Sequence, residues 1–170
     1  MNIILIGTNG AGKSTLATKL YKEGYHIFKE APKGRNHALA ATLCLTDHNI
    51  VFDRWNVLDR LIYENEDEYI NLILKAPHVI NKNNVIIYMR NDATPYDDSE
   101  DPTRSVQRPT YEQRQKLDME YAKHLGTLHR AGIIFYYLDV RPEIEKTFQI
   151  AKSMIENHML MYGDRIPQLT

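Results

Sequence analysis

The stretch from Gly7 to Ser14 has the residue types and spacing that bind nucleotide phosphates. It reads GTNGAGKS and matches the pattern G-x-x-x-x-G-K-[ST] of a phosphate-binding loop, or P-loop. Its glycines let backbone N–H groups turn toward a phosphate, and the helix expected after it adds positive potential. We expect Lys13 to contact the β- and γ-phosphates and to face solvent until a nucleotide binds, while Ser14 offers its hydroxyl to Mg²⁺. The predicted nucleotide-binding residues are Gly7, Asn9, Gly10, Ala11, Gly12, Lys13, Ser14 and Thr15.

The residues on both sides of this loop support the interpretation. Before it, Asn2–Ile6 is an apolar, β-branched run suited to a buried parallel strand. After it, Ser14–Glu23 carries Leu16 and Leu20 on one face of a predicted helix. A chance glycine turn seldom has the whole pattern together with a strand and a helix. The sequence therefore predicts NTP binding.

Charged residues follow two other predicted strands at the points where these strands end. Glu30 follows one strand and is succeeded by Arg35, whereas Asp53 and Arg54 follow the other. Ligands of open parallel sheets bind beyond the carboxyl ends of the strands, so we expect these side chains to lie near the nucleotide. Trp55, the only tryptophan, has two interpretations. It either stacks on a base or sugar at the site or packs against the sheet at the start of a helix.

The elements that must position these residues alternate along the chain. Strands and helices in alternation are typical of βαβ units, so the sequence predicts an α/β fold with a five-stranded parallel sheet. The predicted strands are Asn2–Ile6, Tyr25–Lys29, Asn49–Asp53, Asn84–Met89 and Ile133–Leu138. The predicted helices are Ser14–Glu23, Val57–Glu64, Asp67–Leu74, Tyr111–Ala131 and Arg141–Asn157. The tail from His158 to Thr170 shows no clear pattern, and we expect a docking or disordered end there.

A long polar segment, from Arg90 to Pro109, lacks the periodicity of a helix or a strand. Loops of that length are uncommon in compact domains unless they bind ligands or close over them. We therefore predict a lid, with Arg104 and Arg108 as the cations that it brings to the site. The length of 170 residues predicts one domain that includes this lid.

Several of these motifs together resemble the superfamily of thymidylate kinases and deoxynucleoside kinases. The similarity runs from Asn2 to about Tyr137 and includes the P-loop, the Asp-Arg-aromatic triplet at 53–55 and the basic loop before a long helix. The segment Lys29–Pro32 is similar to the Arg-Glu-Pro or Glu-Pro of these families, although Lys replaces Arg and an alanine precedes the proline. The acidic residues ahead of Arg104 and the short span between the P-loop and Asp53 depart from the family pattern.

The resemblance implies a three-layer αβα fold and roles for individual residues. Arg54 would contact the acceptor's phosphate or the transferring group, and Asp53 would act through Mg²⁺ or the acceptor. Arg104 and Arg108 take the place of the lid arginines. The implied cofactors are ATP and Mg²⁺, and related kinases are often homodimers.

Phosphoryl transfer requires cations that neutralise the transferring oxygens, and Lys13, Mg²⁺ and mobile arginines can supply them. The residues leave two acceptors open. A nucleoside hydroxyl needs a general base, which Glu30 could provide, whereas a monophosphate needs cations such as Arg35 and Arg54. The resemblance favours a nucleotide kinase acting on a deoxynucleoside monophosphate, with a pyrimidine such as dTMP. The alternatives are a deoxynucleoside kinase, a kinase of a hydroxylated base and an NTP-driven switch or ATPase module.

Composition excludes several other classes. A formal net charge of −1 argues against general nucleic-acid or membrane-surface binding. The single cysteine, Cys44, has apolar neighbours and is expected in the core, not as a catalytic thiol. The seven histidines lack zinc-ligand spacing, and no apolar run is long enough to span a membrane. We therefore expect a cytoplasmic protein without a zinc site.

Overall fold

Five apolar runs form one parallel sheet in the computed structural model, which describes residues 1–29, 37–63, 69–91 and 110–163. The strands are β1 (Asn2–Ile6), β2 (His26–Lys29), β3 (Ile50–Asp53), β4 (Asn84–Arg90) and β5 (Phe135–Asp139). They lie in the order β2-β3-β1-β4-β5, so the chain enters at the centre of the sheet and extends it in both directions. The predicted strands are confirmed with shifts of one or two residues at their ends.

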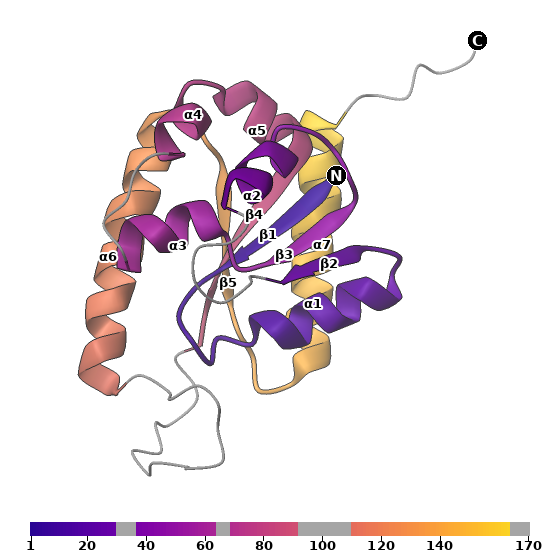
Figure 1. Cartoon of the computed structure of the whole chain (residues 1–170). Helices are drawn as coiled ribbons and strands as arrows, with labels where there is room; N and C mark the ends of the chain where they lie inside the picture. Colours follow the sequence, from indigo (N-terminus) through magenta and orange to yellow (C-terminus); the bar gives the residue numbers. More distant parts are fainter. Residues whose placement is uncertain (30–36, 64–68, 92–109, 164–170) are drawn as a thin grey trace.

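Helices cover both faces of the sheet and give a three-layer α/β architecture (Figure 1). On one face lie α1 (Lys13–Lys22) and α7 (Ile144–Tyr162). On the other lie α2 (His37–Leu43), α3 (Asn56–Tyr63), α4 (Ile70–Leu74), α5 (Pro77–Asn83) and α6 (Tyr111–Arg130). The predicted α/β fold with helices on both sides of a parallel sheet is therefore confirmed.

Burial on both faces explains why the strands are continuous apolar runs and do not alternate with polar residues. Along β1, Ile3 and Leu5 contact the core under α1 and α7, whereas Ile4 and Ile6 contact the core under the other helices. The two-residue repeat of a strand sends successive side chains to opposite faces. Each core therefore holds the same central strand, which carries the P-loop at its end.

The structure also contains helices that the sequence analysis did not identify. The short helices α2 and α5 were missed because neither has enough turns to show a helical period. Tertiary contacts hold α5: Asn81 donates from its amide to Gly132 O at 2.8 Å and accepts from Ile134 N at 2.9 Å.

Over the first five residues of the predicted tail, the disordered alternative was wrong, because these residues are the helical end of α7. Helix α7 starts later than predicted and runs to Tyr162. Its final turns contain His158, which is fully buried beneath the end of α5 and the edge strand β5. None of the helices in the described ranges is both long and apolar enough to cross a membrane.

Candidate phosphate-transfer site

The P-loop connects β1 to α1 through three glycines with positive φ. The φ values of Gly7, Gly10 and Gly12 are 137°, 83° and 82°, which residues other than glycine rarely adopt. Gly7 has a second constraint, because a Cβ there would stand 2.3 Å from Met89 O in β4. The close approach of the loop to β4 therefore requires glycine at this position and fixes the loop against the sheet.

A pocket of about 280 Å³ lies over this loop. Its lining combines backbone groups at the start of α1 with two cations and two hydroxyls. The lining residues are Asn9, Gly10, Gly12, Lys13, Ser14, Thr15 and Arg54. The position at a helix N-terminus and the two cations give the pocket the chemistry of an anion site. Six of the eight predicted P-loop residues, together with Arg54, thus lie around one space.

Lys13 is placed differently from the prediction. We expected its side chain to face solvent, but only 6% of the residue is exposed. The ammonium donates to the carbonyl oxygens of Gly7 at 2.7 Å and Thr8 at 2.8 Å. The Lys13 ammonium is therefore hydrogen-bonded to carbonyls of the P-loop, and a bound phosphate could replace these carbonyls as its partners. An isolated buried ammonium would be costly, which is why these carbonyls turn toward it.

Arg54 reaches the pocket from the end of β3. Its φ of +99° is unusual for a residue with a side chain, and its backbone N–H donates to Leu5 O at 3.1 Å. A non-glycine residue in this region carries about 1–3 kcal/mol of strain, and such residues concentrate at functional sites. The guanidinium Nη2 donates to the side-chain oxygen of Asn9 in the P-loop. The strained backbone thus directs a long cation onto the pocket over the P-loop.

Asp53 ends β3 and lies between β1 and β2, opposite Leu5 and Lys29. It is largely buried, at 8% exposure, and is absent from the side chains that line the 280 Å³ pocket. Ser14, in contrast, is exposed and lines that pocket. Hydroxyl and carboxylate oxygens are suitable Mg²⁺ ligands, and Mg²⁺ keeps most of its remaining positions for phosphates and water. The donor set fits a phosphate-bound Mg²⁺ with Ser14 as its direct protein ligand.

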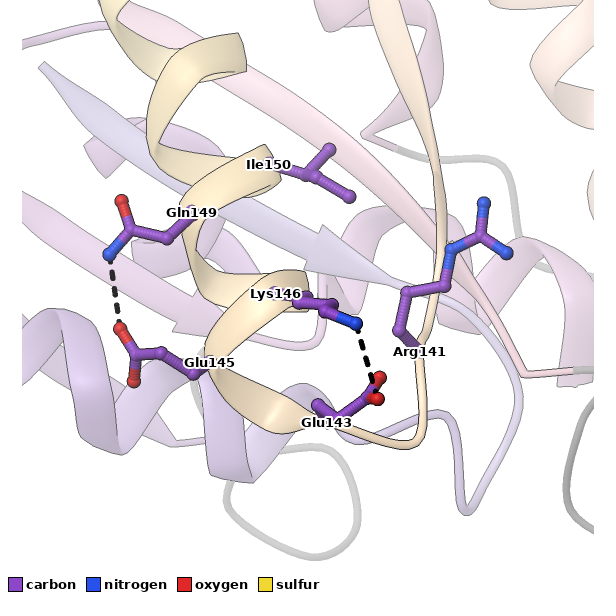
Figure 2. Close-up of a pocket in the computed structure, with 6 residues that line it drawn as sticks. All are labelled: Arg141, Glu143, Glu145, Lys146, Gln149 and Ile150. Atoms are coloured by element: carbon purple, nitrogen blue, oxygen red, sulfur yellow. Dashed lines mark hydrogen bonds and ion pairs between the residues drawn. The ribbon is translucent and has the colours of Figure 1, made fainter.

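A larger hollow of about 560 Å³ lies at the start of α7 (Figure 2). Its described lining consists of Arg141, Glu143, Glu145, Lys146, Gln149 and Ile150, none of which belongs to the P-loop. Lys146 pairs with Glu143 at 3.2 Å, and Gln149 donates to Glu145 at 3.0 Å. These charges neutralise one another on an open surface. The smaller pocket over the P-loop is therefore the candidate site.

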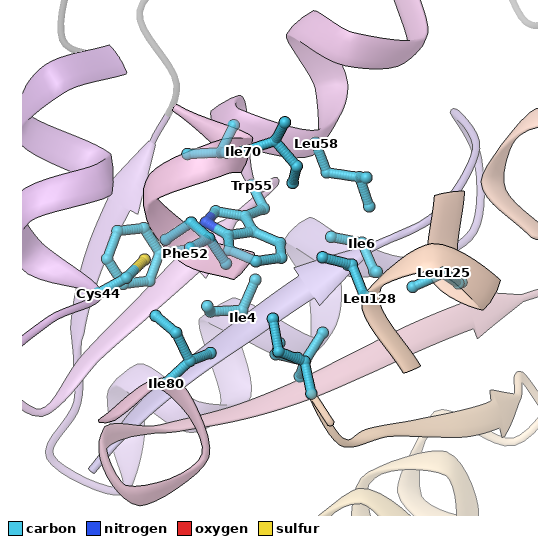
Figure 3. Packing of buried hydrophobic residues seen from close by; sticks show 14 of the residues in the cluster. Ile4, Ile6, Cys44, Phe52, Trp55, Leu58, Ile70, Ile80, Leu125 and Leu128 are labelled. Carbon is cyan, nitrogen blue, oxygen red and sulfur yellow. The ribbon is translucent and has the colours of Figure 1, made fainter. Parts of the chain in front are cut away.

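Trp55 does not line the site, and the substrate-stacking role proposed for it is wrong. The indole is 0% exposed and packs in the core formed with α2, α3 and α6 (Figure 3). Its carbonyl accepts from the backbone N–H groups of Leu58 and Asp59 at 2.9 Å each. Trp55 thus anchors the start of α3, as the second interpretation stated. Cys44 is buried in the same cluster, and this burial raises the pKa of its thiol to about 12.

Asp59 is a site neighbour that the sequence analysis missed. It belongs to α3 and is buried at 5% exposure. Its Oδ1 accepts from Tyr121 Oη at 2.8 Å, and its Oδ2 lies 4.0 Å from Arg54 Nη1. Burial raises the pKa of the Asp59 carboxyl, while Tyr121, Arg54 and Lys13 oppose that rise. The only signal in the sequence was an acidic residue on a helix that is otherwise apolar on the same side.

The remaining predicted site residues lie outside the described ranges. They are Glu30, Arg35, Arg104 and Arg108, together with nearly all of the predicted lid from Arg90 to Pro109. Within the described ranges, no group of three or more His, Cys, Asp or Glu side chains is arranged to hold a metal ion.

Comparisons with known proteins bear on the fold. No model of a known protein family matches the sequence, and no curated protein matches it. The structure resembles the YorR protein of Bacillus subtilis, solved with phosphorylated GDP, with a TM-score of 0.61 and 22% sequence identity over 95% of this chain and 97% of that chain. It also resembles deoxyadenosine kinase of M. mycoides, solved with dCMP and dCDP, with a TM-score of 0.58 and 17% identity over 92% of this chain and 99% of that chain. These likenesses, with the strand order and the P-loop, show that the chain has the fold of a P-loop kinase.

Proposed function

We propose that this protein is a kinase that transfers the γ-phosphate of ATP to a deoxynucleoside monophosphate, with a pyrimidine such as dTMP as the favoured acceptor. The observation that carries the proposal is the position of Arg54, a cation from the end of β3 that lines the same pocket as Lys13 and Ser14. For nucleotide binding alone, the P-loop would be sufficient. A second cation, delivered from another strand, suits a second anionic group beside the first.

The proposed reaction breaks the bond between the γ-phosphorus of ATP and its bridging oxygen. An oxygen of the acceptor's phosphate forms the new bond, so the products are ADP and a deoxynucleoside diphosphate. Lys13 leaves the carbonyls of Gly7 and Thr8 to contact the β- and γ-phosphates, and Arg54 contacts the transferring group or the acceptor. Ser14 would hold a Mg²⁺ ion, which would neutralise charge on the nucleotide when bound. Arg104 and Arg108, in the proposed lid, add charge when it closes and help to exclude water.

A deoxynucleoside kinase is the second candidate, and the resemblance to deoxyadenosine kinase of M. mycoides favours it. In that reaction the nucleophile is a neutral 5′-hydroxyl, whose proton must be removed as the new bond forms. Glu30 is the proposed general base for this case. The two candidates therefore differ in the side chain that the acceptor requires: a carboxylate as general base for a nucleoside, or a cation for a monophosphate.

The deciding experiment measures phosphoryl transfer from labelled ATP and Mg²⁺ to each deoxynucleoside and each monophosphate. For a monophosphate kinase, Arg54→Ala raises the acceptor KM and lowers turnover, because a charge-assisted contact to the phosphate is lost. Glu30→Gln then has little effect, since the acceptor carries its own nucleophilic oxygen. Glu23→Gln is the matched control, because Glu23 is an exposed carboxylate that pairs with Lys152 at 3.3 Å.

A different pattern would overturn the choice of acceptor. If thymidine is the better substrate and Glu30→Gln lowers its turnover by about 10²–10⁴-fold, the protein is a nucleoside kinase. If wild-type protein hydrolyses ATP but phosphorylates none of these acceptors, the ATPase alternative takes the place of both kinases.

A further inference from the structure

A buried chain of polar groups connects α6 to the P-loop pocket behind Arg54. Tyr121 of α6 is 0% exposed and its hydroxyl lies 2.8 Å from Asp59 Oδ1 and 3.4 Å from Gly7 O. Asp59 of α3 in turn faces Arg54, whose guanidinium contacts Asn9 in the P-loop. Gly7 O is also one of the two carbonyls that hold the Lys13 ammonium. The Asp59 carboxylate therefore faces Arg54, and the Tyr121 hydroxyl reaches the carbonyl that also accepts from Lys13.

The second oxygen of Asp59 has no evident structural use. Oδ2 is buried and, within the part of the chain that the structure describes, accepts no hydrogen bond. A buried acceptor without a donor is destabilising, and more so when it is charged. Two cations, Arg54 and Lys13, and one like charge, Asp53, act on this carboxyl. Arg54 Nη1 at 4.0 Å is its ion-pair partner in the structure.

Resting on the proposed function, we propose that Asp59 is a positioning residue for phosphoryl transfer, which holds the Arg54 guanidinium over the P-loop pocket while Tyr121 fixes the carboxylate from behind. Arg54 has a 31% exposed side chain that would otherwise sample many rotamers. Fixing a long arginine side chain costs rotamer entropy, and prior anchoring removes that cost from the transfer step. Asn9 anchors the guanidinium on the loop side, and Asp59 anchors it on the core side.

The two possible roles of Asp59 predict opposite changes in anion binding when its charge is removed. Replacing a buried carboxylate by a neutral amide removes negative charge near an anion pocket, and this effect alone would strengthen anion binding. Loss of a positioning contact to Arg54 would weaken it. Asp59→Asn keeps the shape of the side chain and an oxygen for Tyr121, so it separates the two effects.

The experiment is a double-mutant cycle of Asp59→Asn and Arg54→Ala in the full-length chain at pH 8. Transfer turnover and the affinity for inorganic tripolyphosphate with Mg²⁺ are measured, and thermal melts check folding. With Arg54 present, we expect Asp59→Asn to lower turnover by about 10–100-fold and to weaken tripolyphosphate binding by about 3–10-fold. With Arg54→Ala, the same change should lower turnover or weaken binding by no more than about twofold, because a positioning residue acts only through its partner.

Tyrosine variants provide an independent arm that does not disturb the charge. Tyr121→Phe removes the hydroxyl and should lower turnover about 3–10-fold. Tyr88→Phe is the matched control. The Tyr88 hydroxyl, in β4, also donates to a carboxylate at 2.8 Å, and this carboxylate belongs to Asp118 of α6, the helix that holds Tyr121. This control should retain turnover within about twofold of wild type.

The outcomes separate the inference from the proposed function. Two results would overturn the positioning role. One is an equal loss from Asp59→Asn with and without Arg54. The other is that Asp59→Asn binds tripolyphosphate more tightly than wild type while Arg54 is present. Failure of the wild-type protein to phosphorylate any acceptor would overturn the proposed function. The tripolyphosphate cycle needs no acceptor, so in that case it still decides whether Asp59 positions Arg54.

Discussion

At the scale of single residues, the site stores its charges before any nucleotide arrives. Lys13 is bound to loop carbonyls, and Arg54 is bound to Asn9. The oxygens in these hydrogen bonds are uncharged, and Arg54 also faces the Asp59 carboxylate at 4.0 Å. A phosphate brings full negative charge and stronger, charge-assisted hydrogen bonds, so exchange of partners is favourable.

Lys13→Met tests this description, because methionine keeps the length of the side chain and removes the ammonium. We expect phosphoryl transfer to fall by about 10²–10³-fold, the effect of losing one transition-state donor. Since two buried hydrogen bonds are also lost, the melting temperature should fall by a few degrees, at roughly 2–4 °C per kcal/mol for a chain of this size. Steady-state kinetics and thermal melts measure both effects.

Lys19→Met is the control for that substitution. Lys19 lies on the same helix, and its ammonium pairs with Glu145 at 2.6 Å at the surface. Its replacement should leave transfer unchanged. Normal turnover of Lys13→Met at saturating ATP would show that this loop is not the catalytic site.

At the scale of elements, one buried histidine connects α7 to the strand β5 and the helix α5. His158 is 0% exposed, and its Nδ1 lies 2.9 Å from Tyr136 Oη in β5. Its Nε2 lies 2.7 Å from Asn81 O in α5, which can only accept, so Nε2 carries the proton. Burial lowers the pKa of His158. The neutral imidazole therefore satisfies both neighbours and explains why α7 continues to Tyr162.

This histidine predicts a pH dependence of stability. An unfolded histidine titrates near pH 6.5, and the folded pKa lies below that value, so the unfolded chain binds the proton first as the pH falls. The stabilisation from His158 is complete above about pH 6.5 and decreases below it, by at most about 1.4 kcal/mol per pH unit. Urea unfolding of wild type and His158→Gln between pH 5 and 7.5 should show a stability difference that grows with pH.

His26→Gln is the corresponding control, since His26 is exposed on β2. Its stability should change with pH in parallel with the wild type. A constant difference between His158→Gln and wild type over the whole range would contradict the buried neutral state.

At the scale of the whole molecule, a near-neutral chain places its candidate anion pocket at the end of the central strand. The formal net charge is −1, so no long-range field concentrates polyphosphates at the surface. The P-loop lies at the end of the central strand β1, which both cores bury. A ligand held there should therefore stabilise the entire fold and not a peripheral part of it.

The expected result is an increase in melting temperature with ATP and Mg²⁺. At 100 times the dissociation constant, binding to the folded state contributes about 2.7 kcal/mol. For a chain of this length that corresponds to roughly 5–10 °C. EDTA should reduce the shift, and Lys13→Met should lose most of it. An equal shift in Lys13→Met would place nucleotide binding elsewhere on the molecule.

The sequence by itself determined the features that depend on neighbours along the chain. The P-loop pattern, the five apolar strands and the long helix α6 are local in this sense, because a strand or helix repeats its buried face every few residues. The position of Arg54 also followed, since the carboxyl ends of parallel strands share one edge of the sheet. The burial of Cys44 was predicted from its apolar neighbours and is confirmed.

Only the tertiary structure decided which side chains meet across the chain. Asp59 and Tyr121 are 62 positions apart, and nothing in the local pattern of either helix predicts their contact. Trp55 was ambiguous because an aromatic residue after a strand suits a ligand or a core equally well, and packing against α2 and α6 decided for the core. Lys13 is buried because loop carbonyls turn inward to meet it, a backbone geometry that residue types alone do not specify. Contacts of this kind depend on how helices from distant segments pack on the same face of the sheet, which the tertiary fold alone sets.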